Sequence, residues 1–253
     1  MDPEFSDAQL LRYSRQIMLP GFDIAGQQKL AKSRVLVVGL GGLGCPVAMY
    51  LAAAGVGILV LADFDKIELS NLQRQIAHFQ QDMGRLKVDS VADKVRRLNP
   101  EVEVVTESLP LQDELLRQTV ARVDVVVDAS DNFATRFAIN QACVEQCKPL
   151  ISGAAIRMEG QLSVFRGFEA DQPCYQCLYG EMDEAALTCS EAGVMAPLVG
   201  IIGSMQAMET VKVLSGMGQP LTGKLQILDA MTMEWRTMRL RKDPVCKVCS
   251  RIT

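Results

Sequence analysis

Apolar and polar residues alternate along the chain in blocks that predict strands and helices in turn. Within 85–98 the apolar residues recur on one helical face, which is typical of an amphipathic helix. Short apolar runs indicate strands buried on both faces, and they lie at 35–38, 58–62, 102–106, 124–129 and 150–155. Helices are predicted over much of the first 33 residues and at about 49–54, 85–98, 113–120 and 134–146. This order favours a mostly parallel sheet with helices on both faces.

The pattern changes after Gly160. Apolar and polar residues then alternate with a period of two, which predicts antiparallel strands at 161–165, 224–228 and 234–240. A long apolar helix is expected between them, at about 198–214. We therefore expect the α/β class, with a Rossmann-like parallel sheet and an antiparallel C-terminal extension. The sequence shows no repeat and no flexible linker, which predicts a single domain over 6–253, with halves at about 34–155 and 156–250.

The composition is that of an ordinary globular protein and excludes several other classes. Of the 253 residues, 49 % are hydrophobic and 22 % are charged, which argues against disorder and fibrous repeats. A net charge of −4 argues against a nucleic-acid partner, because such partners usually meet a basic surface. His78 is the only histidine of the sequence, so mechanisms built on several histidines are excluded.

Nothing near the start of the sequence is typical of an export signal, so a cytoplasmic protein is expected. Residues 1–5 carry two acids and a proline and are typical of residues added by cloning. The uncharged run 35–62 is long enough to span a bilayer. Its first half, however, holds four glycines and a proline, which favour a strand, a turn and a helix. No membrane partner is therefore expected. In a reducing compartment the eight cysteines favour metal binding or chemistry over disulfides.

A glycine-rich turn joins the first predicted strand to the next helix. In 39–44 the glycines Gly39, Gly41 and Gly44 match the nucleotide-binding fingerprint, and Gly42 adds a fourth. Because glycine lacks a Cβ atom, backbone N–H groups of such a turn approach a phosphate at the positive end of a helix. Asp63 ends the next strand, where a carboxylate can accept hydrogen bonds from ribose hydroxyls. The pattern predicts a nucleotide without saying which one, and a turn that binds no ligand is the alternative.

Charged residues downstream of this turn favour a triphosphate over a nicotinamide dinucleotide. Arg74 and Lys87 are cations that follow Asp63 and Asp65, and a triphosphate carries more concentrated charge than a dinucleotide does. Taken alone, either cation also fits a solvated surface position.

Asp131 and Asn132 come directly after the predicted strand 124–129. The carboxyl ends of strands line the ligand crevice in open α/β sheets, and an acid there can hold Mg²⁺ on phosphates. The alternative is a helix N-cap, for which Asp and Asn are both favoured. The two roles are compatible, one for each residue.

Two Cys-x-x-Cys pairs predict a structural zinc site. They comprise Cys174 with Cys177 and Cys246 with Cys249, and four thiolates complete a closed tetrahedral site. The long interval requires the fold to bring the C-terminal tail back to the first pair. Two separate redox pairs are the alternative, but neither pair opens an evident helix that would lower a thiol pKa.

The other four cysteines divide into two kinds. Cys45, Cys143 and Cys147 lie in predicted helices, where a buried structural cysteine is expected. Cys189 lies in a polar loop and is either an unused thiol or a nucleophile that accepts an acyl group or sulfur.

Together these motifs resemble the MoeB/ThiF family, adenylyltransferases that activate ubiquitin-like sulfur-carrier proteins and are related to ubiquitin-activating enzymes. The resemblance extends from the segment 12–16 to Cys249 and is carried by 39–44, Asp63 with Asp65, 70–75, Lys87, 131–132 and both cysteine pairs. The segments 152–161 and 191–197 are closer to the molybdopterin branch of the family than to the thiamine branch. The resemblance implies a single ubiquitin-activating-enzyme-like adenylation domain over 6–253.

Several site residues follow from the resemblance alone. It implies that Gly42 and Asp63 hold the adenosine part of ATP, that Asn71, Arg74 and Lys87 hold the phosphates, and that Asp131 holds Mg²⁺. Arg15 matches an arginine that reaches the phosphates in the partner subunit, which implies a homodimer with shared ATP sites.

The implied reaction joins the C-terminal glycine carboxylate of a sulfur-carrier protein to AMP and releases pyrophosphate. A carboxylate is already ionised at neutral pH, so the attack needs no general base, which agrees with the single histidine. In the molybdopterin branch a separate sulfur donor is expected to act on the adenylate. In the thiamine branch Cys189 is expected to bond covalently to the activated carrier.

Three other functions stay open from the sequence. A nicotinamide-dependent oxidoreductase is supported by the glycine turn alone. A binding module that holds a ubiquitin-like partner without chemistry conflicts with the intact Arg74, Lys87 and Asp131. An enzyme that adenylates a carboxylate for tRNA modification fits less well with the acidic composition and the zinc pairs.

Overall fold

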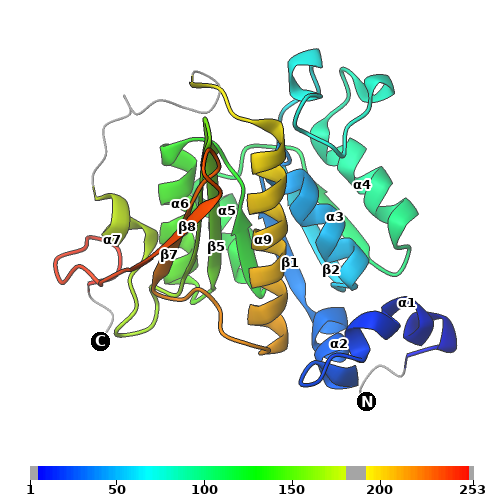
Figure 1. The fold of residues 1–253 in the computed structure, drawn as a ribbon, viewed down its shortest axis with the longest axis horizontal. Coiled ribbons are helices and arrows are strands. Elements are labelled where there is room, and N and C mark those ends of the chain that lie inside the picture. The colour runs from blue at the N-terminus through cyan, green and yellow to red at the C-terminus, as the bar shows by residue number, and fades with distance from the viewer. Residues whose placement is uncertain (1–4, 181–191, 251–253) are drawn as a thin grey trace.

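The computed structural model describes residues 5–180 and 192–250, and within these ranges the chain forms one eight-stranded sheet (Figure 1). The strands are β1 Arg34–Val38, β2 Ile58–Ala62, β3 Glu103–Glu107, β4 Val125–Asp128, β5 Leu150–Ile156, β6 Glu159–Phe165, β7 Lys224–Asp229 and β8 Glu234–Arg239. Their order across the sheet is β3-β2-β1-β4-β5-β6-β7-β8. Neighbours from β3 to β5 are parallel and neighbours from β5 to β8 are antiparallel, which confirms the predicted change of pattern.

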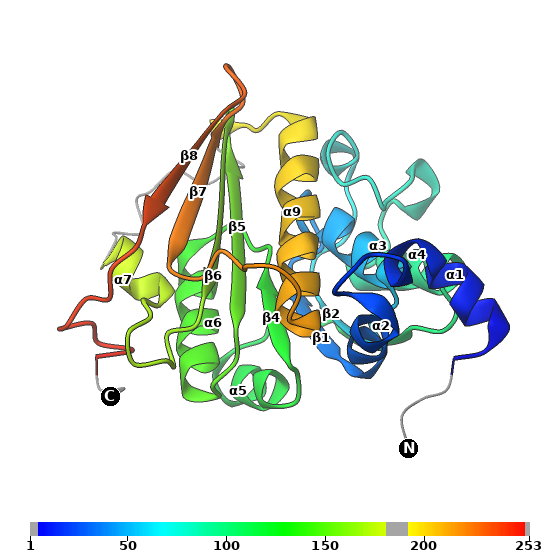
Figure 2. The ribbon, with the colours of Figure 1, turned by 60° about the horizontal axis from the view of Figure 1, so that its bottom comes forward.

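Helices cover both faces of the parallel half (Figure 2). They are α1 Asp7–Ile17, α2 Asp23–Lys32, α3 Gly44–Ala54, α4 Lys87–Leu98, α5 Asp113–Ala121, α6 Phe133–Glu145, α7 Tyr175–Tyr179 and α9 Ala196–Ser215, with short 3-10 turns η1 Leu69–Asn71 and η2 Gln80–Asp82. Val35 and Val37 of β1 pack in a core with α3, α4 and α9. Leu36 and Val38 point to the opposite face and pack with α5 and α6. Burial on both faces explains why β1 has no polar side of its own.

The boundaries of the elements from β1 onward agree with the sequence to within two residues, except that α3 begins at Gly44, five residues before the predicted start at 49. α4 begins at Lys87, two residues after the predicted start, because Leu86 is extended and pairs with Lys66 in an isolated bridge. Cys45 and Cys143 are buried in α3 and α6, as predicted, but the prediction for Cys147 is wrong. That residue is exposed beyond the end of α6, with a φ of 53°, because the helix ends before it reaches this thiol.

The 20-residue helix α9 packs across the centre of the sheet, against α3, β5 and β6. Pro197 stands in its first turn, where the absent N–H costs no hydrogen bond. Its buried residues recur three and four positions apart, and most of the others are partly buried, which confirms the prediction of a buried apolar helix near 198–214. No helix of the described ranges combines the length and apolar character needed to cross a bilayer.

Candidate functional site

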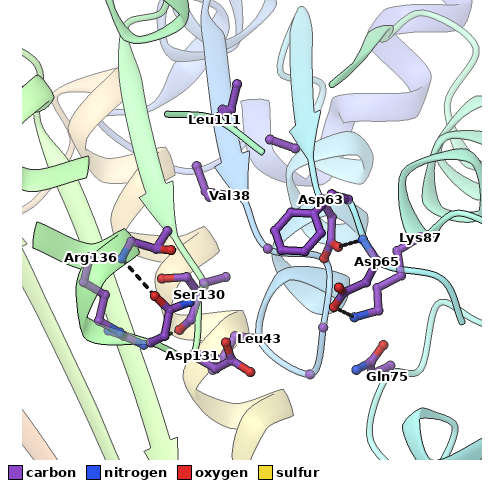
Figure 3. Close-up of a pocket in the computed structure, with 18 of the residues that line it drawn as sticks. Val38, Leu43, Asp63, Asp65, Gln75, Lys87, Leu111, Ser130, Asp131 and Arg136 are labelled. Atoms are coloured by element: carbon purple, nitrogen blue, oxygen red, sulfur yellow. Dashed lines mark hydrogen bonds and ion pairs between the residues drawn. The ribbon is translucent and has the colours of Figure 1, made fainter. Parts of the chain in front are cut away.

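A pocket of about 310 Å³ opens at the carboxyl ends of β1, β2 and β4 (Figure 3). After β1 the chain continues to β2 on one side, and after β4 it continues to β5 on the other side. Such a switch point is the usual ligand crevice of open α/β sheets. Val38, Leu111 and Ala62 form apolar lining, while the polar groups predicted from the sequence line much of the remainder. Those predicted residues are Gly39, Gly41, Gly42, Asp63, Asp65, Arg74, Lys87, Asp131 and Asn132.

Close packing explains why the turn after β1 is built from glycines. Gly39 has a φ of +87°, and a Cβ atom there would lie 2.7 Å from the carbonyl oxygen of Ala129. A Cβ atom on Gly44 would lie 1.8 Å from the carbonyl oxygen of Gly39, so this glycine closes the turn and does not line the pocket. Gly41 and Gly42 are the turn glycines left facing the pocket before α3 begins. Their backbone can therefore approach a phosphate at the helix N-terminus.

Asp63 is held in a fixed orientation at the end of β2. Its Oδ2 accepts a hydrogen bond of 2.7 Å from the Leu40 N–H, and its Oδ1 accepts one of 2.9 Å from the Asp65 N–H. Burial raises the pKa of Asp63, and the nearby Lys87 ammonium opposes that rise. The carboxylate thus braces the glycine turn and also lines the pocket.

The two cations differ in their surroundings. The Lys87 side chain is 8 % exposed, and its Nζ lies 2.7 Å from Oδ2 of Asp65, which is 53 % exposed. Arg74 donates from Nη1 to the carbonyl oxygen of Ser70 over 3.0 Å. A bound phosphate would compete with Asp65 for Lys87, so this ion pair keeps the ammonium at the pocket until an anion arrives.

Asp131 and Asn132 differ in their surroundings, and the N-cap role is confirmed for Asn132 alone. Asn132 is the N-cap of α6, and its side chain accepts a hydrogen bond of 2.9 Å from the Thr135 N–H. Asp131 is exposed and lines the pocket. Its carboxylate is therefore available to a cation that accompanies a phosphate.

A buried ion pair close to Asp131 in the chain, between Arg136 and Asp128, was not predicted from the sequence. The Arg136 guanidinium lies 3.5 Å from the Asp128 carboxylate and donates to the carbonyl oxygens of Ser130 and Gly153. Ser130 in turn donates from Oγ to Asp128 Oδ1 over 2.6 Å. These contacts hold the backbone that presents Asp131. An acid at the end of an apolar strand and an arginine eight residues later in α6 were the available signal.

Not every predicted residue lies in the pocket. Asn71 does not line it, and its Oδ1 accepts a hydrogen bond of 3.1 Å from the Glu68 N–H. Arg15 is exposed on α1 and lies outside the pocket of its own chain. Cys189 lies outside the described residues. Gln75 was not predicted individually, yet it lines the pocket with only 4 % of its surface exposed.

The four cysteines of the two Cys-x-x-Cys pairs converge in space, although 72 residues separate Cys174 from Cys246. All four sulfur atoms lie within 4.8 Å of one another. The pairs Cys174–Cys246 and Cys177–Cys249 have Sγ–Sγ distances of 3.7 and 3.4 Å. Four thiolates bound to zinc at about 2.3 Å form a tetrahedron with edges of about 3.8 Å, so the donor set fits zinc.

One expectation about these pairs is wrong. Cys174 is the N-cap of the short helix α7, whereas neither pair was expected to open a helix. A hydrogen bond from Cys174 lowers the pKa of Cys177 to about 5, so one thiol of the group ionises readily. The convergence of both pairs still favours one four-sulfur site over two redox pairs.

Comparisons with known proteins agree with this geometry. Residues 13–248 match the ThiF family. The chain is 52 % identical over 246 residues to molybdopterin-synthase adenylyltransferase of Escherichia coli strain K12, covering 97 % of this chain and 98 % of the relative. It is 46 % identical over 244 residues to the sulfur carrier protein ThiS adenylyltransferase of the same strain, covering 96 % of each chain.

Longer and more distant relatives share the fold. The chain is 43 % identical over 250 residues to the adenylyltransferase and sulfurtransferase MOCS3 of Aedes aegypti, covering 98 % of this chain and 57 % of that relative. A crystal structure of E. coli MccB with MccA-N7isoASN superposes with a TM-score of 0.84 at 22 % identity, covering 98 % of this chain and 76 % of that one. At this identity the superposition supports the fold alone.

Proposed function

This chain belongs to the ThiF family, and from that premise we propose that it activates a ubiquitin-like sulfur-carrier protein by ATP-dependent adenylation. The observation that carries the proposal is the convergence of the glycine turn, Asp63, Lys87 and Asp131 on one pocket. The identity of 52 % to a molybdopterin-synthase adenylyltransferase favours a carrier of the molybdopterin-synthase type. The ThiS adenylyltransferase, at 46 % identity, supports a thiamine-type carrier as the alternative.

The reaction requires the site to position the carboxylate against the α-phosphorus and to neutralise the charge of the phosphates. The C-terminal carboxylate of the carrier attacks the α-phosphorus of ATP, the bond to the bridging oxygen breaks, and pyrophosphate leaves. No proton has to be removed, since the carboxylate is ionised at neutral pH. Backbone N–H groups of Gly41 and Gly42, with Arg74 and Lys87, would neutralise the phosphate charge, and Asp63 would bind the ribose. Asp131 would hold the Mg²⁺ that accompanies ATP.

Two of the implied ligands do not line the pocket of this chain. Asn71 would bind a phosphate oxygen through its Nδ2 donor, while its Oδ1 accepts from the Glu68 N–H. Arg15 would reach a phosphate only in the partner subunit of a homodimer. The exposed apolar residues Leu11 and Met18, on and just after α1, support an interface at this helix, with exposures of 77 and 71 %.

We also propose that the four converging cysteines hold a structural zinc ion. With four thiolate ligands the ion would have no open position, so it would supply no chemistry to the reaction and would join the C-terminal tail to α7 and its N-cap residue. The sulfur–sulfur distances of 3.4 and 3.7 Å support this assignment.

The direct test offers the protein ATP, Mg²⁺ and a carrier of either type. Mass spectrometry should detect the carrier acyl-adenylate with the molybdopterin-synthase type, and Asp131→Ala should abolish the ATP–pyrophosphate exchange that depends on the carrier. Glu114→Ala, on the exposed surface of α5, is the control. Exchange retained by Asp131→Ala would remove this residue from the mechanism, and the absence of any adenylate would contradict the proposed function.

Adding a sulfur donor to the same mixture and measuring sulfuration of the carrier distinguishes the two branches. Cys189→Ala should leave carrier sulfuration intact if a separate sulfur donor acts directly on the adenylate. Loss of sulfuration with normal adenylation would instead support a covalent intermediate on Cys189.

A further inference from the structure

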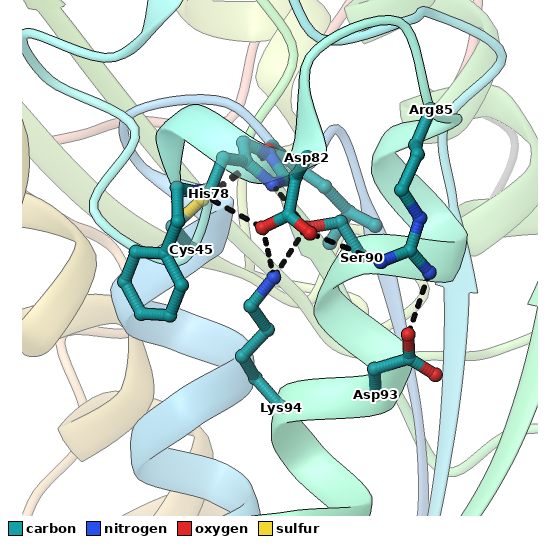
Figure 4. A network of polar contacts seen from close by, with 9 residues as sticks. Cys45, His78, Asp82, Arg85, Ser90, Asp93 and Lys94 are labelled. Atoms are coloured by element: carbon teal, nitrogen blue, oxygen red, sulfur yellow. Dashed lines mark hydrogen bonds and ion pairs between the residues drawn. The ribbon is translucent and has the colours of Figure 1, made fainter.

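His78 lies outside the pocket, buried between the glycine turn and α4, with 4 % of its surface exposed. Its Nε2 lies 3.1 Å from the carbonyl oxygen of Leu40, and its Nδ1 lies 3.0 Å from Oγ of Ser90 (Figure 4). We propose that His78 is a positioning residue that holds the glycine turn in the form that binds phosphate. The proposal rests on the proposed function, because it assigns a role in binding ATP.

The hydrogen-bond partners determine which ring nitrogen carries the proton. The Leu40 carbonyl can only accept, so Nε2 must donate to it. In the neutral ring Nδ1 then accepts from the Ser90 hydroxyl, and Ser90 Oγ accepts a hydrogen bond of 2.9 Å from Lys94 Nζ. Donors therefore run in one direction, from Lys94 through Ser90 and His78 to Leu40. Burial lowers the pKa of His78, which favours this neutral form.

Lys94 is itself held in place by buried and partly exposed charges (Figure 4). It pairs with the Asp82 carboxylate, which is 2 % exposed and also accepts a hydrogen bond of 3.0 Å from Arg85. Arg85 bonds in turn to Asp93 on α4. The chain of donors that ends at Leu40 thus begins at a lysine that is paired with a buried carboxylate.

The bond to Leu40 matters because of peptide geometry. In a trans peptide the C=O and the following N–H point in opposite directions. Holding the Leu40 carbonyl toward His78 therefore directs the Gly41 N–H away from it, and Gly41 lines the pocket. Leu40 is held on its other side too, since its own N–H donates to Asp63 over 2.7 Å. We find no acceptor for the Gly41 N–H among the described residues, so it is available to a phosphate oxygen.

Residue His78 connects the glycine turn to the two segments that carry the proposed cations. Its ring contacts Leu40 of the turn and Ser90 of α4, the helix that begins at Lys87. Its backbone N–H donates to the Gln75 carbonyl oxygen over 3.0 Å, next to Arg74 in the loop after β2. His78 thereby bonds to a neighbour of Arg74 and to the helix of Lys87, and only the two ring contacts depend on its side chain.

Amide side chains of two lengths test the proposal. In His78→Gln the amide nitrogen can reach the position of Nε2, whereas in His78→Asn it reaches only the position of Nδ1. We expect His78→Gln to bind ATP nearly as the wild type does, and His78→Asn and His78→Leu to bind it roughly tenfold more weakly, the effect of losing one such hydrogen bond. Adenosine affinity should change little in all three, because Gly41 serves the phosphates. Isothermal titration calorimetry with ATP and adenosine measures both.

The outcomes separate this proposal from the proposed function. A wild-type protein that binds no ATP contradicts the proposed function, whereas wild-type binding with equal affinities in all three variants overturns the role of His78. Equal losses for ATP and adenosine would indicate a merely structural role and would also overturn it. Should the variants not fold, ¹⁵N NMR of the wild type reads the tautomer of the single histidine directly. A proton on Nδ1 with none on Nε2 would contradict the proposal.

Discussion

At the scale of single residues, Gln75 is buried although its side-chain hydrogen bonds are not all satisfied. It lines the pocket with 4 % of its surface exposed, yet its buried Oε1 has no hydrogen-bond partner among the described residues. A buried unpartnered amide oxygen costs roughly 1–3 kcal/mol, so stability alone does not explain a glutamine here. Its Nε2 lies on the side of Gly41, where a Cβ atom would be 3.5 Å away (Figure 3). The amide is therefore placed to donate to a ligand at the glycine turn.

We predict that Gln75→Leu separates stability from binding. Removing the unpartnered oxygen should leave the free energy of unfolding unchanged or raise it by about 1 kcal/mol, while ATP affinity falls, because the donor is lost. Urea unfolding without nucleotide and calorimetric titration with ATP measure the two effects. Gln73→Leu, at an exposed position outside the pocket, is the matched control and should alter neither by more than about 0.5 kcal/mol. A large loss of stability in Gln75→Leu would assign the residue to the core instead.

At the scale of elements, the crossing of α3 and α9 decides how closely the second half of the chain approaches the nucleotide turn. Gly203 of α9 faces the start of α3, where a Cβ atom would lie 2.4 Å from the Leu43 carbonyl oxygen and 2.5 Å from Pro46 Cγ. Val199, one turn earlier in α9, packs closely on Gly42 of the glycine turn. A Cβ atom on Gly42 would lie 2.8 Å from Cγ2 of Val199. A glycine on α9 and a glycine in the turn before α3 therefore permit the contact that shapes one wall of the pocket.

A pair of alanine substitutions in α9 tests this crossing. Gly203→Ala should lower the free energy of unfolding by about 1–3 kcal/mol, because backbone atoms of the turn would have to move. Gly200→Ala meets open space on the same helix and should raise it by roughly 0.5–1 kcal/mol through helix propensity. Urea unfolding of both variants gives the comparison. Equal effects would show that α3 and α9 do not pack as closely as described.

At the scale of the whole molecule, the cysteine group is the contact that returns the C-terminal tail to the body of the protein. Three of its four cysteines are buried with Val144 of α6, so the group adjoins the core of the α5 and α6 face. Residues 240–250, after β8, contain no helix or strand, and a terminal segment of this kind frays unless it is fastened to the body of the protein. Metal binding and folding of this region should therefore be coupled.

We predict one zinc ion per chain and a loss of stability when it is removed. Elemental analysis should find zinc in stoichiometric amount, and Cys246→Ser should lose it and lower the melting temperature, since a metal bound only by the folded state stabilises that state. Cys147→Ser, an exposed thiol outside the group, should retain both the zinc and the melting temperature. A zinc-free wild type with an unchanged melting temperature in chelator would contradict the assignment.

Much of the site could be predicted because its signals are local. The glycine turn, Asp63, Lys87 and Asp131 each stand at the end of a strand or the start of a helix, so their positions follow from the order of elements. Asn71 could not be placed from its motif, because a local hydrogen bond from the Glu68 N–H to its Oδ1 decides where its side chain lies. Arg136 and His78 were not predicted, because their partners are distant in sequence or are backbone carbonyls, which no residue pattern reveals.

The sequence by itself determined the class of fold, the change from parallel to antiparallel strands and the place of the nucleotide turn, because hydrophobic period and missing Cβ atoms act over a few residues. The tertiary structure alone decided which groups meet across the chain. It joined two cysteine pairs 72 residues apart, buried Arg136 on Asp128 and placed His78 against Leu40. Such contacts depend on how whole elements pack, and packing is settled by the entire core at once rather than by any local pattern.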